Sequence, residues 1–294
     1  MRLSHNIPSL NIFREYVKNT KKNSQALSRI STGEKIIKAG DDPYGLAKSE
    51  RMRIQIRSMQ MAQKNLQDGV SMLQTADSGL DSLNSITQRM RELTIQSGNA
   101  GSDEDKKIIK NEMDEMIEAF KTIVNNTEFN GTKLLNVDED RLMQIGAKVG
   151  DNIDIPFVDL SPDKIGVMKK NASGELELDS TKTLQHLKDN LDILSDDFIG
   201  NSLEILDAVS NKLVDVRSKY GALNNMFEGE YDNLSEFEMG VTEAESSIRD
   251  ADVAEEIIEF AKTGLLMEAG NAMMVQSNKL PQEVLRILEN VRSR

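Results

Sequence analysis

The stretch from Asp41 to Asn99, DDPYGLAKSERMRIQIRSMQMAQKNLQDGVSMLQTADSGLDSLNSITQRMRELTIQSGN, decides the fold of this chain. Asp42 can cap a helix, Pro43 suits its first turn, and no further proline occurs before Pro156. At about 1.5 Å per residue the stretch predicts a helix roughly 80 Å long. We expect a rod that packs against a partner along one seam, which favours a structural element over an enzyme. The seam consists of apolar or small residues three or four positions apart: Met59, Ala62, Leu66, Val70, Leu73, Ala76, Leu80, Leu83, Ile86, Met90 and Leu93.

Both ends of the chain carry shorter amphipathic patterns. Apolar residues recur at helical spacing from Leu3 to Leu27, with Pro8 expected in the first turn, and again from Val253 to Met274. Pro281 is expected to interrupt the last helix. Because neither helix can bury its apolar stripe alone, we expect both ends to be disordered in a monomer and ordered after association.

The middle of the chain changes period twice. Ser102 can cap a helix that continues to Ile123, and an Asn-Gly turn follows at Phe129–Thr132. Between Leu135 and Thr181 apolar residues alternate in a pattern typical of a short β-hairpin, with Pro156 at an edge. Helical spacing returns near Leu184 and then continues from Leu203 to Ile248, which predicts a second rod that can pair antiparallel with the first.

These patterns predict a mainly α fold of long antiparallel helical rods or coiled coil, with a small insert that contains a β-hairpin. We expect two domains. Residues 1–41 and 251–294 would form a terminal coiled-coil domain, and residues 42–250 a helical rod domain whose β insert lies at about 136–180. The composition agrees, because aromatic residues are only 4 % and there is no Trp, whereas large β cores use more aromatic residues.

Charge and cysteine content exclude several classes of protein. The net charge of −13 argues against a general nucleic-acid binder, and no apolar run is long enough to insert into a membrane. There is no cysteine, so disulfides and thiolate sites are excluded. Met1–Thr20 lacks a secretory apolar region, which leaves a cytosolic protein or one exported without a cleaved signal peptide.

The charge is unevenly distributed along the chain. Residues 1–60 contain twelve Lys or Arg and five Asp or Glu, a net charge of +7 within a chain of −13. This basic segment either faces acidic surface on its own chain or on a neighbour, or forms an ordinary solvated face.

No constellation for catalysis, a cofactor or a metal is expected. His5 and His186 lie on different segments, and the Glu112–Glu118 run of carboxylates indicates a solvated helix face more than a di-metal site. Asp250 and Asp252 are better explained by helix capping than by calcium, since the EF-hand ligand pattern is missing. The sequence therefore predicts a protein that is not an enzyme.

Several longer motifs resemble bacterial flagellin, in the family's order, over roughly residues 20–160 and 203–288. The N-terminal motifs are Leu27–Gly33, Gly40–Asp42, Gly45–Ala47, Asp68–Ala76, Gln88–Gln96 and Thr127–Gly131, and the C-terminal ones are Ala244–Asp252 and Leu280–Leu285. The resemblance implies a short flagellin without large outer domains. It would be a structural subunit that polymerises with itself into an extracellular filament for motility.

The resemblance also implies partners and a location. A cytosolic export chaperone would assist transport of the unfolded chain, and hook-associated junction and cap proteins would contact the filament. The terminal helices would pair as a coiled coil in the filament core. The residues expected to pack there are Leu10, Phe13, Val17, Leu27, Ile257, Phe260, Met267 and Met274.

A second surface resembles the one that an animal innate-immune receptor for flagellin recognises and that also serves axial packing. Its candidate residues here are Gln88, Arg89, Glu92, Leu93 and Glu112. On the bare helical pattern, Leu93 faces the seam while Arg89 and Glu92 are ordinary exposed residues. The nearest alternative function is a hook–filament junction protein, which Ser31–Gly33 and Asp41–Pro43 slightly favour, and a cytosolic coiled-coil adaptor is a remote one.

Overall fold

The computed structural model describes residues 6–99, 101–148, 150–170, 176–189 and 198–292, and the chain forms two compact units. Unit 1 contains residues 1–56 and 239–294, and unit 2 contains residues 57–238. The elements are α1 (Ile7–Thr32), α2 (Pro43–Gly98), α3 (Asp103–Asn126), β1 (Glu128–Phe129), β2 (Thr132–Lys133), β3 (Asp140–Gln144), β4 (Asn152–Pro156), β5 (Gly166–Lys170), β6 (Leu176–Thr183), α4 (Leu184–Asp189), α5 (Phe198–Arg249) and α6 (Val253–Arg292).

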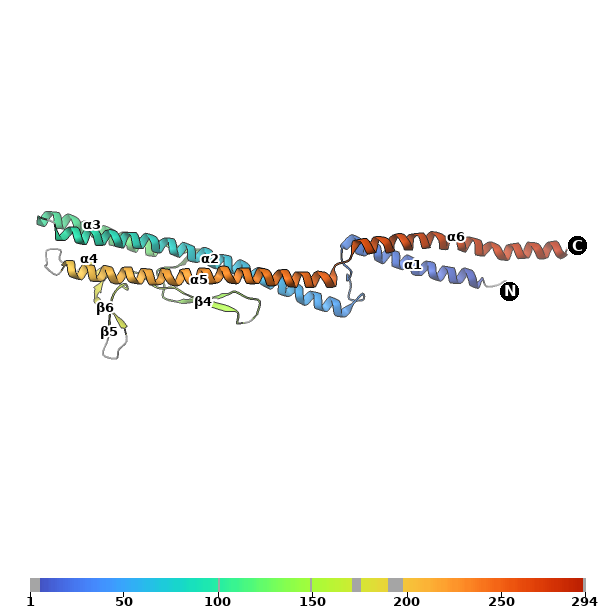
Figure 1. The fold of residues 1–294 in the computed structure, drawn as a ribbon, viewed down its shortest axis with the longest axis horizontal. Coiled ribbons are helices and arrows are strands. Elements are labelled where there is room, and N and C mark those ends of the chain that lie inside the picture. The colour runs from blue at the N-terminus through green and yellow to red at the C-terminus, as the bar shows by residue number, and fades with distance from the viewer. Residues whose placement is uncertain (1–5, 100, 149, 171–175, 190–197, 293–294) are drawn as a thin grey trace. The chain divides into compact units, whose positions relative to one another are not determined.

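Unit 1 is built on an antiparallel pair of helices, α1 and α6, which lie side by side (Figure 1). Polar contacts fix the register. The Asn23 amide donates to the Phe260 carbonyl at 3.0 Å and to the Thr263 hydroxyl at 2.9 Å. One turn before the C-terminus of α1, Arg29 forms an ion pair of 2.9 Å with Glu256. The two ends of the chain therefore pair, as the helical patterns predicted.

The expectation that Pro281 interrupts the last helix is wrong, because α6 continues through it to Arg292. A proline inside a helix leaves the carbonyl four residues earlier without its usual N–H donor. That carbonyl belongs to Ser277, and it accepts a hydrogen bond of 3.0 Å from the Asn6 side-chain amide instead. Asn6 also caps α1, since its side-chain oxygen accepts from the Ser9 N–H at 3.2 Å.

The links between the long helices form a bridged junction within unit 1. Glu34 and Asp250 make an isolated antiparallel bridge, in which the Lys35 N–H donates to the Arg249 carbonyl at 2.6 Å. Gly33 has a φ of +73°, a left-handed conformation that ends α1 and that glycine adopts without a Cβ penalty. The Arg249 guanidinium forms ion pairs with Glu34 at 3.2 Å and Glu50 at 2.7 Å, so it ties the first link to the start of α2.

Unit 2 packs α3 and the adjoining lengths of α2 and α5 around a continuous apolar core. Cross-helix pairs show that α2 and α5 run antiparallel, as predicted: Arg217 bonds Asp77 and Asp81 at 2.8 Å each, and Gln67 donates to Tyr231. The fully or nearly fully buried side chains include Leu66, Leu73, Leu80, Leu83, Met90 and Leu93 of α2, Met113, Ile117 and Phe120 of α3, and Val209, Leu213, Tyr220 and Phe227 of α5.

Three two-stranded antiparallel sheets accompany these helices. The predicted Asn-Gly turn joins β1 and β2, with φ of +50° at Asn130 and +77° at Gly131. The predicted hairpin is formed by β3 and β4, where Pro156 pairs at the end of the ladder with Asp140. The β5–β6 pair was predicted only as part of the β insert. The sequence also predicts a turn at Asn171–Gly174, which lies outside the described residues.

The predicted domain division and the compact units do not share boundaries. The sequence placed the divisions after residues 41 and 250, whereas the compact units divide after residues 56 and 238. The first turns of α2 and the last turns of α5 thus belong to the same compact unit as the terminal pair. The assignment of these parts to functional domains stays a prediction.

Candidate functional site

The α1–α6 pair of unit 1 carries many exposed large apolar side chains. Its large apolar side chains keep between 44 and 68 % of their surface open. On α1 they are Ile7, Leu10, Phe13, Val17 and Leu27, and on α6 they are Val253, Ile257, Ile258, Leu265, Leu266, Met273, Val275 and Leu280. By contrast, Ala26 is the only buried residue among those of α1. Exposed apolar side chains in this number on two paired helices indicate a candidate interaction site.

The residues predicted to pack in a filament core lie on this pair, and none of them is buried within one chain. Leu10, Phe13, Val17, Leu27 and Ile257 are exposed. Phe260, Met267 and Met274 are intermediate. Burying a side chain of this size completely contributes about 1.5–3 kcal/mol, so a substantial part of that stabilisation is left for another molecule.

Polar contacts also join α1 to α6, and they were not predicted from the sequence. Thr263 and Ser277 are buried, and they meet Asn23 and Asn6 from the other helix. Small polar residues at positions where the seam is expected to be apolar are the signal that could have identified them. A buried polar contact costs free energy unless it is satisfied, so these pairs specify which residues of α1 face α6.

The second predicted surface divides into exposed and buried members. Arg89 on α2 bonds Glu92 at 3.1 Å and Glu112 of α3 at 2.8 Å, and the hydrogen bond to Glu112 is the main reason that the pKa of Arg89 is raised. Gln88, Arg89 and Glu92 are exposed and Glu112 is intermediate. Leu93 is buried in the core of unit 2, so its side chain offers no open surface there.

Glu118, a carboxylate of α3 outside this surface, joins α3 to α4. The Glu118 carboxylate accepts a hydrogen bond from Lys188 of α4, which lowers the pKa of Glu118. Across the described residues there is no group of three or more metal-ligating side chains placed to hold an ion. None of the helices, as far as they are described, is long and apolar enough to cross a membrane.

An antiparallel pair of terminal helices with an open apolar face, attached to a bundle that closes its own core, defines a structural protein made for association. Comparison with known proteins gives the family. The N-terminal helical region of bacterial flagellin matches residues 3–139, and the C-terminal helical region matches residues 203–288. The chain belongs to the bacterial flagellin family.

Individual relatives agree along the full length. A flagellin of Bacillus subtilis (strain 168) is 38 % identical, and the alignment covers 98 % of this chain and all of that protein. The flagellar filament 30.7 kDa core protein of Treponema maltophilum is 32 % identical, with the same coverage. A solved structure of a putative flagellar hook-associated protein from Vibrio parahaemolyticus covers 71 % of this chain and all of that one, with a TM-score of 0.59 at 15 % identity. This last likeness shows the fold alone.

Proposed function

We propose that the α1–α6 pair supplies the contacts by which this chain, a structural subunit of the bacterial flagellar filament, polymerises with copies of itself. Family membership and the full-length relatives establish the filament subunit. The role of particular residues is our proposal: Leu10, Phe13, Val17, Leu27, Ile257, Phe260, Met267 and Met274 would pack between neighbouring copies. The observation that carries it is the open apolar face of both helices.

If the contact between copies is head-to-tail, each added copy leaves a free surface for the next one. The copies then form a helical fibre, unless the rotation between them closes a ring. The experiment compares two isoleucines that are both exposed in the free chain, Ile257 on α6 and Ile108 on α3. Ile257→Asn is expected to leave the monomer folded and to prevent sedimentable filaments. Ile108→Asn, the matched control, is expected to polymerise. If Ile257→Asn forms filaments at the wild-type protein concentration, the proposal fails.

We also propose that the filament's extracellular position is reached by export of the unfolded chain, without removal of a signal peptide and with a cytosolic chaperone. The support is the family's implied export route and the lack of cysteines that could crosslink an unfolded chain. The mass of filament protein sheared from cells tests this. An intact N-terminus is expected, and a shortened one would contradict the proposal.

The hook-associated junction and cap proteins are proposed partners, because any protein that ends or caps the polymer meets the same open faces of α1 and α6. The rival function, that the chain is itself a junction protein, is not favoured by the comparisons. The likeness to a hook-associated structure concerns the fold, which both kinds of protein would share. The family is structural, and we propose that the chain has no enzymatic activity.

An animal innate-immune receptor is a further proposed partner of the surface around Arg89. The support is that Arg89 and Glu92 of α2, both exposed, form one charged cluster with the partly exposed Glu112 of α3. Arg89→Ala is expected to lower the response of a receptor reporter assay. Arg91→Ala, which removes the ion pair to Asp207 instead, is the matched control. An unchanged response to Arg89→Ala would remove that residue from the proposal.

A further inference from the structure

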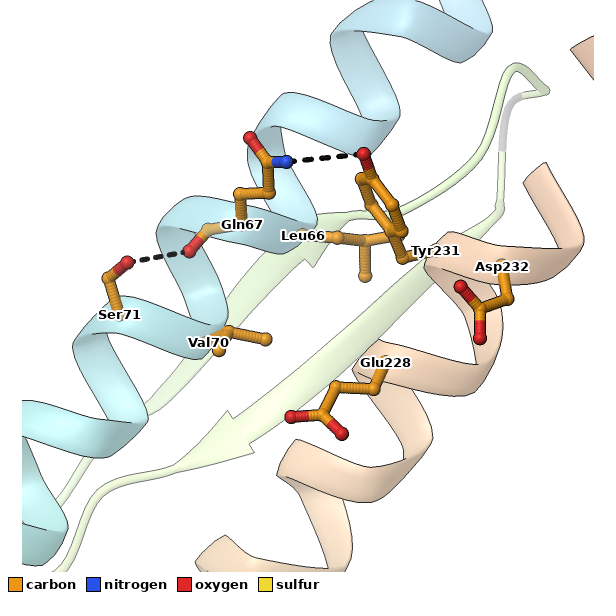
Figure 2. Close-up of a pocket in the computed structure, with 7 residues that line it drawn as sticks. All are labelled: Leu66, Gln67, Val70, Ser71, Glu228, Tyr231 and Asp232. Carbon is orange, nitrogen blue, oxygen red and sulfur yellow. Dashed lines mark hydrogen bonds between the residues drawn. The ribbon is translucent and has the colours of Figure 1, made fainter. Parts of the chain in front are cut away.

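A groove between α2 and α5 in unit 2 has an apolar floor and an acidic wall (Figure 2). Its volume is about 610 Å³, and it is lined by Leu66, Gln67, Val70 and Ser71 of α2 and by Glu228, Tyr231 and Asp232 of α5. Figure 2 shows the Glu228 and Asp232 carboxylates extending from α5 into the space beside α2. Among the described residues neither carboxylate has an ion-pair partner; Glu228 only accepts a hydrogen bond of 2.9 Å from Asn224. Two unpaired carboxylates beside an apolar floor suit a basic segment that also carries apolar surface.

The chain contains such a segment in unit 1. Tyr44, Lys48 and Arg51 lie at positions i, i+4 and i+7 of α2, and therefore on one face of the helix. All three are exposed, Tyr44 to 80 %. In the described part of the chain Lys48 and Arg51 form no ion pair, whereas the neighbouring Arg53 pairs with Glu50. This face is part of the basic segment in residues 1–60.

We propose that the α2–α5 groove of one copy receives the Tyr44–Arg51 face of α2 from a second copy of this chain. This rests on the proposed function, since it names a further contact of the same polymer. Tyr44 would lie on the floor near Val70 and Tyr231, which are both partly exposed, and Lys48 and Arg51 would meet Glu228 and Asp232. The two cations are about 4.5 Å apart along their helix and the two carboxylates about 6 Å apart along theirs, so the pairs match in spacing.

Charge complementarity between the groove and the Tyr44–Arg51 face favours a second copy of this chain as the molecule bound in the groove. Copies with a net charge of −13 repel one another at long range, so a contact between them needs local opposite charges. The carboxylates of the groove and the cations of the Tyr44–Arg51 face supply these opposite charges, and each surface would pair with the other. Tyr and Arg are also the residues that most often dominate protein interfaces. The contact is heterologous, because one copy gives the face and the other the groove, and such contacts extend a polymer.

The test is a charge exchange followed by sedimentation at a series of protein concentrations. Lys48→Glu with Arg51→Glu, and separately Glu228→Lys with Asp232→Lys, are each expected to raise the critical concentration for assembly at least about tenfold at low salt. A chain that carries all four substitutions is expected to return to within about twofold of wild type. Lys106→Glu with Lys107→Glu on α3 is the control of equal charge change, expected to assemble as wild type.

Several results overturn the contact while leaving the proposed function intact. These are wild-type assembly of both double variants, no rescue in the fourfold variant, and an equal loss in the α3 control. If wild-type protein itself does not polymerise, the proposed function fails instead. Circular dichroism checks that each variant folds. Should a charge-reversed chain be misfolded, Lys48→Gln with Arg51→Gln replaces it, and an unchanged critical concentration for that folded variant also refutes the contact.

Discussion

Units 1 and 2 use the same kind of amphipathic helix in opposite ways. In unit 2, α3 buries Ile109, Met113, Ile117, Phe120 and Val124, one residue in almost every turn. In unit 1, α1 is of similar length and has a similar apolar stripe, yet only Ala26 is buried. The number of neighbouring helices accounts for the difference, because α3 contacts both α2 and α4, whereas in the described part of the chain the helix that contacts α1 is α6. Unit 2 is therefore expected to be stable alone, and unit 1 to become stable when another molecule covers it.

The largest expected effect contrasts two phenylalanines. Phe227 is fully buried in unit 2, and Phe13 is half exposed on α1. Phe227→Ala is expected to lower the free energy of unfolding by about 3–5 kcal/mol through loss of burial and the cavity left behind. Phe13→Ala is expected to change the monomer by less than about 1 kcal/mol and to impair polymerisation. Urea unfolding and sedimentation measure the two effects, and equal losses of monomer stability would erase the distinction between the units.

Alanine substitutions at two glycines compare a closely packed position of unit 2 with an open one. A Cβ on Gly69 would lie 2.7 Å from Met143 Cε and 3.1 Å from Phe227 Cε2, where the β3–β4 hairpin meets both long helices. Gly69→Ala is expected to cost about 1 kcal/mol, because the free end of Met143 can move away but the buried Phe227 ring has to shift. Gly229 has nothing within 4 Å of its Cβ position, so Gly229→Ala is expected to stabilise α5 by about 0.5–1 kcal/mol. Thermal unfolding compares them, and a stabilising Gly69→Ala would contradict the close contact.

In unit 1 a double-mutant cycle isolates the contact between Asn6 and Ser277. Asn6→Ala removes both the helix cap and the donor to the Ser277 carbonyl, with an expected cost of about 1–2 kcal/mol. Pro281→Ala restores a backbone N–H that can bond the same carbonyl. We expect Asn6→Ala to cost less by about 0.5–1 kcal/mol in the Pro281→Ala background, measured by unfolding of assembled filaments. Additive effects would show that Asn6 does not replace the bond lost at proline.

The smallest effect concerns Tyr220, which is buried in unit 2 with no hydrogen-bond partner for its hydroxyl in the described structure. Burial raises the pKa of Tyr220 to about 12. The folded chain thus binds this proton more tightly than the unfolded chain, and its contribution to stability, complete below about pH 10, falls as the pH rises towards 12.

Tyr220→Phe is expected to be neutral or slightly stabilising at pH 8, because no hydrogen bond is lost. At pH 11 it is expected to be more stable than wild type by about 1 kcal/mol. Urea unfolding at both pH values gives the comparison. If the free energies of unfolding of Tyr220→Phe and wild type differ by the same amount at pH 8 and pH 11, the pKa of the Tyr220 phenol does not change on folding.

The long helices and their caps follow from local rules, and the sequence predicted them well. Asp42 accepts hydrogen bonds from the Tyr44 and Gly45 N–H groups before α2, and Ser102 accepts one from Asp105 before α3. The turn at Asn130 was predicted because its residues adopt a left-handed backbone, and the β3–β4 hairpin was predicted from the alternation of its apolar residues.

What failed depends on residues far apart in the chain. The continuity of α6 at Pro281 needs a donor from Asn6, 271 residues before Ser277, and no local pattern contains that pairing. The stripe residues of α1 were identified from spacing, but their exposure follows from the absence of a third helix beside them within the described unit. The groove at Glu228 and Asp232 exists only because α2 and α5 lie together, so it could not be predicted from either helix.

Amide hydrogen exchange of monomer and filament tests the central claim most directly. The account predicts that amides of residues 7–30 and 253–280 exchange rapidly in the monomer and become protected by a large factor in the filament. The amides of α3, residues 109–124, are predicted to be protected in both states. Equal protection of the terminal helices before and after polymerisation would contradict the account.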